Sequence, residues 1–375
     1  MTDTDTTQRN GSVFVLGAGF TKAFAPAAPL MVDDYGAADL AEKFIKFPHV
    51  SRLLDRIRND YNDRINIEEL MTRLSGLMPY DFVEGAANEY GMLLVELKKS
   101  FMRKITEAKS RHIEKGLLGE FAQYCVQVRA TCVSLNYDDI FDEALFKTWE
   151  DGKPSTSCWH PGGGYGFFCR SSFLCVEDIP AFMGQDTAML LLKLHGSMNW
   201  FPRIGYSSPY SIDAFVHHED WFTEEALTMS LDEGSKIDRE IVIRHIEPEP
   251  FIVPPVLTKA ALVEQPMLRV IWQLAYHALS AAKEVIFVGY SLPVTDISVS
   301  TLMVESMGAD FIDNNSIKVV NKAESKEDMR AIKDRYRALF GDIPDENFYF
   351  GGALKWARRL VSKMKSSPGP AMHLF

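Results

Sequence analysis

The chain lacks cysteine pairs at metal-binding spacing. Its 375 residues include five cysteines, and none of them forms a C-x-x-C pair: Cys125, Cys132, Cys158, Cys169 and Cys175. Structural zinc sites usually rest on such pairs, so no zinc module is expected, and buried reduced thiols are the simpler interpretation. The run 217–220, HHED, has metal-ligand residue types, but adjacent side chains do not converge on one ion. The sequence therefore predicts no metal site.

Long apolar runs and an excess of positive charge are also absent. No uninterrupted apolar stretch approaches the roughly 20 residues that span a bilayer, and the first ten residues, MTDTDTTQRN, are polar rather than those of a signal peptide. We therefore expect a cytoplasmic protein without a membrane segment, with residues 1–11 a disordered lead-in. The net charge of -11 argues against a general positive field that would attract nucleic acid. Any contact with nucleic acid is therefore expected only indirectly, through a partner.

Five continuous apolar runs are present, and each is typical of a strand buried on both faces of a sheet. They span residues 13–16, 130–135, 189–194, 285–288 and 317–320. Each leads within two residues to a small or polar residue: Gly17, Asn136, His195, Gly289 and Asn321. The pattern predicts an α/β fold, a Rossmann-like doubly wound parallel sheet with its ligand crevice along the carboxyl ends of the strands.

Helical periodicity surrounds this predicted core. Residues from about 35 to 128 carry apolar side chains at helical spacing, which predicts a large helical insertion suited to covering a pocket or to forming an oligomer surface. Two further amphipathic helices, 326–340 and 353–365, predict a C-terminal helical extension over 325–375. The remaining residues, 12–324, are then one ligand-binding domain that contains the insertion.

The first strand ends in a glycine-bracketed turn, LGAGFTK. Gly17 and Gly19 allow a tight turn and close approach to a ligand, and Thr21 can cap a helix whose free N–H groups favour a phosphate. Lys22 stands where the dinucleotide fingerprint has its third glycine, so an ordinary strand-to-helix turn is the alternative. The glycine run 162–164 is followed by neither helix nor lysine, which favours a hairpin or surface loop.

Polar residues after the second and third strands are the candidate catalytic groups. Asn136 and Asp138 follow one strand and His195 follows the next, where a histidine can act as a general base near neutral pH. Two structural alternatives stay open. Asp138 or Asp139 can cap the helix predicted over 140–149, and a lone histidine can be a buried structural residue.

Taken together, these motifs resemble the sirtuin-like fold, in particular the prokaryotic SIR2-like family of antiphage defence proteins. The matching elements, in family order, are GAGF at 17–20, NYD at 136–138, KLHGS at 193–197, VPP at 253–255, GYSLP at 289–293 and VN at 320–321. The resemblance implies NAD as substrate, with catalytic residues Asn136, Asp138 and His195. It also implies that the nucleotide is held by Gly17, Ala18, Gly19, Phe20, Thr21, Gly289, Ser291 and Asn321.

Two departures from the deacetylating sirtuins set the expected activity. The chain has no four-cysteine zinc module, and residues 25–31, APAAPLM, lack an aspartate-phenylalanine-arginine run. The resemblance therefore implies NAD hydrolysis to ADP-ribose and nicotinamide, by an effector that depletes NAD and is controlled by homo-oligomerisation or by a HerA-type hexameric ATPase. A non-catalytic NAD or ADP-ribose sensor and a protein deacylase are the alternatives. Nucleic-acid cleavage lacks the clustered carboxylates of a two-metal site.

Overall fold

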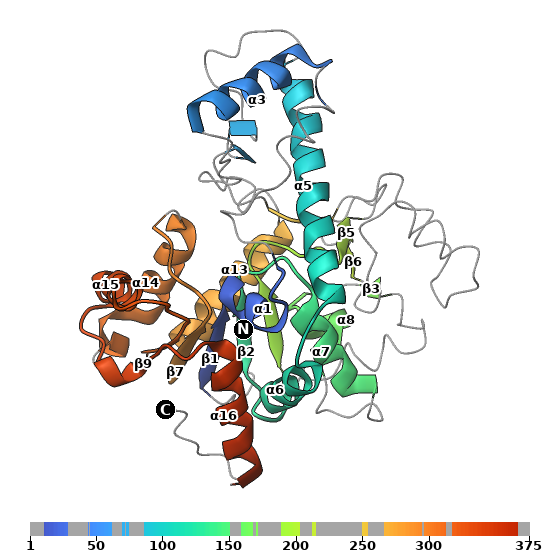
Figure 1. Cartoon of the computed structure of the whole chain (residues 1–375). Helices are drawn as coiled ribbons and strands as arrows, with labels where there is room; N and C mark the ends of the chain where they lie inside the picture. Colours follow the sequence, from blue (N-terminus) through green and yellow to red (C-terminus); the bar gives the residue numbers. More distant parts are fainter. Residues whose placement is uncertain are drawn as a thin grey trace.

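A six-stranded parallel sheet forms the core of the chain (Figure 1). The computed structural model describes residues 11–28, 44, 46–61, 70–71, 73–74, 86–150, 159–167, 170–171, 189–202, 212–214, 250–253, 266–294, 296–312 and 317–366. The sheet order is β4-β2-β1-β7-β8-β9. These strands span Ser12–Leu16 (β1), Thr131–Ser134 (β2), Leu190–Lys193 (β4), Glu284–Val288 (β7), Ile317–Val320 (β8) and Phe348–Tyr349 (β9). Since the chain winds from β1 toward one edge and then returns toward the other, the predicted doubly wound sheet is confirmed.

Helices cover both faces of this sheet. Their bounds are Ala18–Phe24 (α1), Pro48–Tyr61 (α3), Ala86–Ser110 (α5), Lys115–Gln127 (α6), Ile140–Glu150 (α7), Pro161–Gly164 (α8), Pro266–Ser280 (α13), Ile297–Ile312 (α14), Lys326–Phe340 (α15) and Ala353–Ser366 (α16). A second, small sheet has the order β3-β6-β5, with strands Arg170–Ser171, Ile212–Ala214 and Trp200–Pro202. In the described part of the chain, no helix has the length and apolarity required to cross a membrane.

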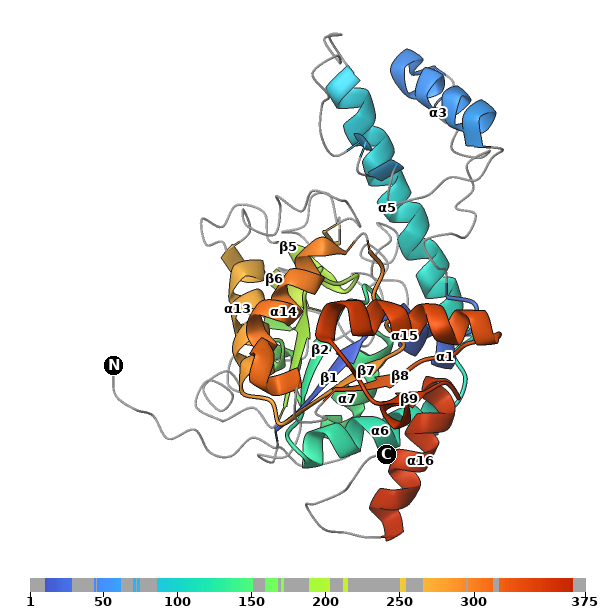
Figure 2. The same cartoon turned by 90° about the vertical axis from the view of Figure 1, so that its left-hand side faces the viewer.

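Aromatic side chains join the helices to each face of the sheet. On one face, the ring of Phe14 in β1 lies 5.8 Å from Phe121 of α6 and 6.1 Å from Trp356 of α16. On the other face, the ring of Phe287 in β7 lies 5.1 Å from Tyr336 of α15. These large apolar side chains bury the core between the two helical layers, which Figure 2 shows on either side of the sheet.

The C-terminal residues contribute to the same core. Strand β9 pairs with β8 and so extends the main sheet, and α16 packs on α6. Two ion pairs also join these helices, Arg358 to Glu114 at 3.0 Å and Lys365 to Glu120 at 2.7 Å. The division into a domain over 12–324 and an extension over 325–375 stays a prediction.

The glycine run 162–164 is not the predicted hairpin or surface loop; that prediction was wrong. Residues Pro161–Gly164 form one buried helical turn, α8, and the His160 imidazole caps it by accepting the Gly162 N–H at 3.0 Å. A Cβ at Gly164 would lie 2.2 Å from the indole Nε1 of Trp159. The glycines therefore allow this turn to pack directly against an aromatic ring.

Helix α5 is the longest helix described and extends well beyond the sheet (Figure 1). Its outer half packs with α3 in a second apolar cluster, separate from the main core. The cluster also contains Tyr137 and Met198, which lie in loops that follow β2 and β4. Part of the predicted insertion therefore reaches the carboxyl end of the sheet.

Gly289 gives a direct test of how closely the loops after β1 and β7 pack. Its φ is +66°, and a Cβ there would lie 2.1 Å from the backbone N of Phe20. Gly352 is a matched control, because its φ is +83° but the nearest atom to a Cβ, on Lys322, is 3.7 Å away. We expect Gly352→Ala to lower the free energy of unfolding by about 1–2 kcal/mol, the cost of left-handed backbone, and Gly289→Ala to lower it by more. Equal losses in urea titrations would contradict this packing.

Candidate functional site

The predicted site residues follow one row of paired strand ends. Pairing between neighbouring strands places the last residues of all six strands in register: Lys193, Ser134, Leu16, Val288, Val320 and Tyr349. Gly17, Gly289 and Asn321 come directly after this row. Asn136 and His195 each lie two residues beyond the matched pair of Ser134 and Lys193. We call the set 17–21, 136, 138, 195, 289, 291 and 321 the strand-end site.

Two side chains after β2 bind the glycine turn after β1. The amide Nδ2 of Asn136 donates a hydrogen bond to the carbonyl of Gly17 at 3.0 Å. The Asp138 carboxylate accepts the Thr21 hydroxyl at 2.5 Å, and its other oxygen accepts the backbone N–H of Ile140 at 3.2 Å. Both residues are buried. Asp138 therefore has the capping role that the sequence left open, and it also holds the first turn of α1.

The predicted helix cap at Thr21 was wrong. Helix α1 begins at Ala18, the capping position is Gly17, and no side chain caps it. Thr21 lies inside the helix, where its hydroxyl faces Asp138. The ring of Phe20 packs in the core, 5.5 Å from Phe141.

The glycines of this turn lie where the backbone after β1 passes close to the backbone after β7. A Cβ at Gly17 would lie 2.6 Å from the Cα of Tyr290, and one at Gly19 would lie 2.8 Å from the carbonyl oxygen of Gly289. The N–H of Gly19 also donates to that carbonyl at 2.8 Å. The need for glycine at both positions is therefore explained by close packing of the loops after β1 and β7, whatever ligand they bind. Ala18 between them is exposed.

His195 is buried in an aromatic environment after β4. Its ring centroid lies 6.1 Å from that of Tyr137 and 6.4 Å from that of Trp272. The backbone of the same residue is fixed, because its carbonyl accepts the Val253 N–H at 2.8 Å. The adjoining Gly196 has a φ of +79°, a conformation that glycine adopts readily, so the chain turns directly after the histidine.

The residues after β7 and β8 lie at the other side of the row. The Asn321 side chain donates to the carbonyl of Tyr290 at 3.0 Å and accepts the N–H of Lys322 at 2.9 Å. Its amide therefore already bonds to backbone on both sides. Ser291 is exposed, and its carbonyl accepts the Arg335 side chain at 2.8 Å.

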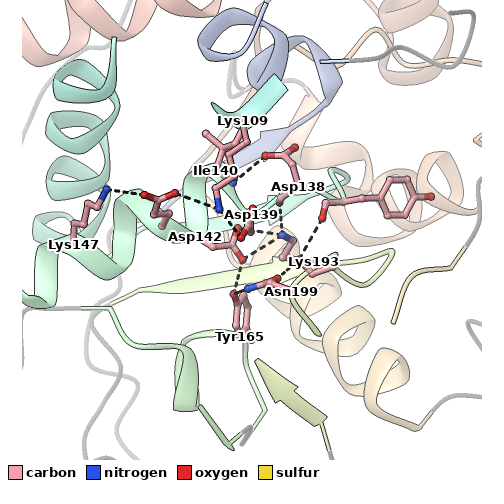
Figure 3. A network of polar contacts seen from close by, with 12 residues as sticks. Lys109, Asp138, Asp139, Ile140, Asp142, Lys147, Tyr165, Lys193 and Asn199 are labelled. Carbon is pink, nitrogen blue, oxygen red and sulfur yellow. Dashed lines mark hydrogen bonds and ion pairs between the residues drawn. The ribbon is translucent and has the colours of Figure 1, made fainter. Parts of the chain in front are cut away.

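A buried polar network contacts the backbone of Asp138 (Figure 3). The ammonium of Lys193 donates to the backbone carbonyl of Asp138 at 2.6 Å and lies 3.1 Å from the Asp142 carboxylate. That carboxylate also accepts the Tyr165 hydroxyl at 2.5 Å, and the tyrosine oxygen accepts the Asn199 amide at 3.2 Å. The network therefore links the loop after β2 with the loop after β4.

Burial sets the protonation of the acidic groups at this edge. It raises the pKa of Asp138 and of Asp139, while the ammonium of Lys193 opposes the rise at Asp138. Burial alone would lower the pKa of Lys109, but the carboxylates of Asp139 and Glu143 outweigh it, so the pKa is raised. Lys109 lies 2.9 Å from Asp139 and 3.3 Å from Glu143. The pairing thus favours the charged form of Lys109, whereas burial disfavours the charged forms of Asp138 and Asp139.

Sequence reasoning missed the residues that support the predicted site. Lys193 lies inside the apolar run 189–194, and a lysine there requires a buried partner, which is a usable signal. Tyr165 and Asn199 gave no such signal, since their contacts cross between loops. Among the described residues no group of histidine, cysteine and acidic side chains could hold a metal ion, and the run 217–220 lies outside them.

The fold and the site together define a doubly wound α/β protein with a polar site at the carboxyl edge of its parallel sheet. No protein-family model and no curated protein matches the chain. Among solved structures it is similar to a SIR2 homologue in complex with NAD, at 12% identity and a TM-score of 0.44, over 95% of this chain and 89% of that one.

Two further structures are similar at the same level. One, described as the structural basis for the mechanism and regulation of Sir2 enzymes, has 12% identity and a TM-score of 0.42, over 96% of this chain and 93% of that one. The other, Sir2 bound to an acetylated peptide, has 12% identity and a TM-score of 0.39, over 95% and 94%. At this identity and these TM-scores, the similarity does not assign a role to any residue of the site.

Proposed function

We propose that the chain hydrolyses NAD+ to ADP-ribose and nicotinamide at the strand-end site. The observation that carries this proposal is the register of the sheet. Asn136 and His195 each follow one of two neighbouring strands, two residues beyond the matched pair of Ser134 and Lys193, and Asn136 contacts the glycine turn. Amide, carboxylate and imidazole groups are thus gathered at one sheet edge, where doubly wound proteins bind their ligands.

The proposed reaction breaks the bond between the nicotinamide nitrogen and the ribose. Nicotinamide leaves with the bonding electron pair, positive charge develops on the ribose, and a water oxygen forms the new bond. The Asp138 carboxylate is suited to stabilise that charge, Asn136 to orient the ribose, and His195 to accept the proton that water releases. Residues 17–21, Gly289, Ser291 and Asn321 would hold the rest of the nucleotide.

The biological role is proposed from the motif resemblance. An enzyme that depletes NAD serves as an antiphage effector only if it is restrained in uninfected cells. We propose that a homo-oligomer or a HerA-type ATPase supplies this control, in the cytoplasm, and that any nucleic acid is engaged through that partner. Asn136 and Asp138 bond to the protein itself, which suits a site whose activity depends on a second component.

Asn136→Ala tests the proposal. We expect nicotinamide release from NAD+ to fall by about 100-fold, because the ribose loses its orienting group, while NAD+ binding measured by calorimetry persists. The assay uses the full chain alone and with its candidate partner. Asn347→Ala is a control for the loss of a buried, backbone-bonded asparagine away from the site. Equal turnover in the Asn136 variant and the unmutated chain would contradict the proposal, and NAD+ binding without any turnover by the unmutated chain would favour the sensor.

A further inference from the structure

The four residues that follow Leu135 alternate between two neighbours. Asn136 bonds to Gly17, directly before α1, and Asp138 bonds to Thr21 in the first turn of α1. The residues between and after them, Tyr137 and Asp139, instead contact helix α5. The loop 136–139 is therefore contacted from two sides. The two candidate catalytic residues face α1, and the other two residues face α5.

Two residues of α5 make these contacts. The ring of Phe101 lies 5.5 Å from that of Tyr137, edge to face at 87°. Two turns further along, the ammonium of Lys109 lies 2.9 Å from the Asp139 carboxylate. Lys109 is only 3% exposed, so its charge has been removed from water and depends on its carboxylate partners, Asp139 and Glu143.

Tyr137 also connects α5 to the loop of His195. Its hydroxyl donates to the Val253 carbonyl at 2.8 Å, and its own carbonyl accepts the Met198 N–H at 2.9 Å. Its ring lies 6.1 Å from the His195 ring. A shift of Tyr137 would therefore move the backbone of both loops that carry candidate catalytic groups.

A row of buried side chains winds around α5 from these contacts toward its outer half. Buried side chains recur at every fourth position: Leu93, Leu97, Phe101, Ile105 and Lys109. The helix has 25 residues and so is about 37 Å long at ~1.5 Å per residue. Leu93 and Leu97 belong to the apolar cluster shared with α3, and Phe101 and Tyr137 belong to the same cluster. This one apolar cluster therefore extends from α3 along α5 to the loop.

We propose that Phe101 and Lys109 are positioning residues, through which α5 sets the conformation of the 136–139 loop. The outer unit of α3 and α5 then regulates the strand-end site, because a displacement along α5 changes where Asn136 and Asp138 lie. The predicted effect on catalysis rests on the proposed function. The predicted effect of α5 on the loop conformation does not. The effect of α5 on the loop can be measured by hydrogen exchange at the amides of 137–140, an experiment that needs no enzymatic turnover.

The first test compares Phe101→Leu with Phe47→Leu in the full chain. Both changes remove a ring from the same apolar cluster, but Phe47 lies beside Phe44 near α3 rather than against the loop. We expect Phe101→Leu to raise hydrogen exchange at the amides of 137–140 by about tenfold relative to Phe47→Leu. We also expect kcat for nicotinamide release to fall about tenfold, with KM changed by less than about twofold. Equal exchange in the two variants would overturn the proposal.

The second test concerns the ion pair. Lys147 contacts the same Glu143 as Lys109, at 2.7 Å, but is exposed, so Lys147→Met is the matched control for Lys109→Met. Because Lys109→Met leaves a buried carboxylate unpaired, Lys109→Arg is measured beside it and is expected to restore slow exchange at 137–140. If Lys109→Arg folds but exchanges as fast as Lys109→Met, the positioning role fails. If the unmutated chain releases no nicotinamide while these exchange differences appear, the proposed function fails and the control by α5 stands.

Discussion

Replacing His195 by alanine is expected to reduce nicotinamide release by about 100- to 10,000-fold, the range typical of a lost general base. His195 is 6% exposed and its ring lies near the rings of Tyr137 and Trp272, so it is shielded from bulk water while its backbone is fixed by Val253. Alanine removes the proton acceptor but leaves that backbone bond. NAD+ binding is therefore expected to persist, with a dissociation constant changed by less than about threefold.

His277→Ala is the control for this experiment, because His277 is exposed on α13, away from the row of strand ends. Nicotinamide release is measured by chromatography and NAD+ binding by calorimetry on the same preparations. Turnover by His195→Ala equal to that of the control would remove His195 as the base. Loss of NAD+ binding together with turnover would instead assign it a role in holding the nucleotide.

Replacing Asp142 by leucine is expected to lower the free energy of unfolding by about 3–5 kcal/mol, the usual cost of leaving one partner of a buried ion pair uncompensated. Asp142 and Lys193 are 1% exposed each and lie 3.1 Å apart. Without the carboxylate, the Lys193 ammonium keeps its hydrogen bond to the Asp138 carbonyl but loses the Asp142 carboxylate. The Tyr165 hydroxyl also loses its acceptor.

The double variant Lys193→Met with Asp142→Leu separates charge from packing. Removing both charges also removes the cost of burying an unpaired ammonium, so we expect the double variant to be more stable than Asp142→Leu alone. Asp345→Leu is a control, because Asp345 is an exposed partner of Lys333, and its removal is expected to have a far smaller effect. Urea titrations of the unmutated chain, Lys193→Met, Asp142→Leu, the double variant and Asp345→Leu measure these differences. Strictly additive losses in the double variant would show that the pair is not coupled.

The sheet was predictable because its strands are buried on both faces. A parallel strand between two helical layers needs an apolar residue at nearly every position, so Phe14 and Phe287 lie in runs that are visible without any alignment. The short edge strand β9 was not predicted. It has two residues, and its place depends on pairing with β8 rather than on a pattern of its own.

The strand-end positions were predictable for the same reason, since register follows from where each apolar run stops. The contacts between them were not. Thr21 was expected to cap a helix, yet it bonds to a carboxylate 117 positions away in the sequence. The partnership of Lys109 with Asp139 likewise joins separate elements. Such pairs depend on how loops cross at the edge of the sheet, which periodicity does not encode.

The most direct test of the central claim is the identity of the products formed from NAD+ in water labelled with oxygen-18. The full chain, with and without its candidate partner, is incubated with NAD+, and the products are identified by mass spectrometry. The account predicts equimolar nicotinamide and ADP-ribose, with one labelled oxygen in the ADP-ribose, and about 100- to 10,000-fold less of both products from the His195→Ala chain. Bound NAD+ with no nicotinamide under either condition would contradict it and leave a nucleotide sensor in place of a hydrolase.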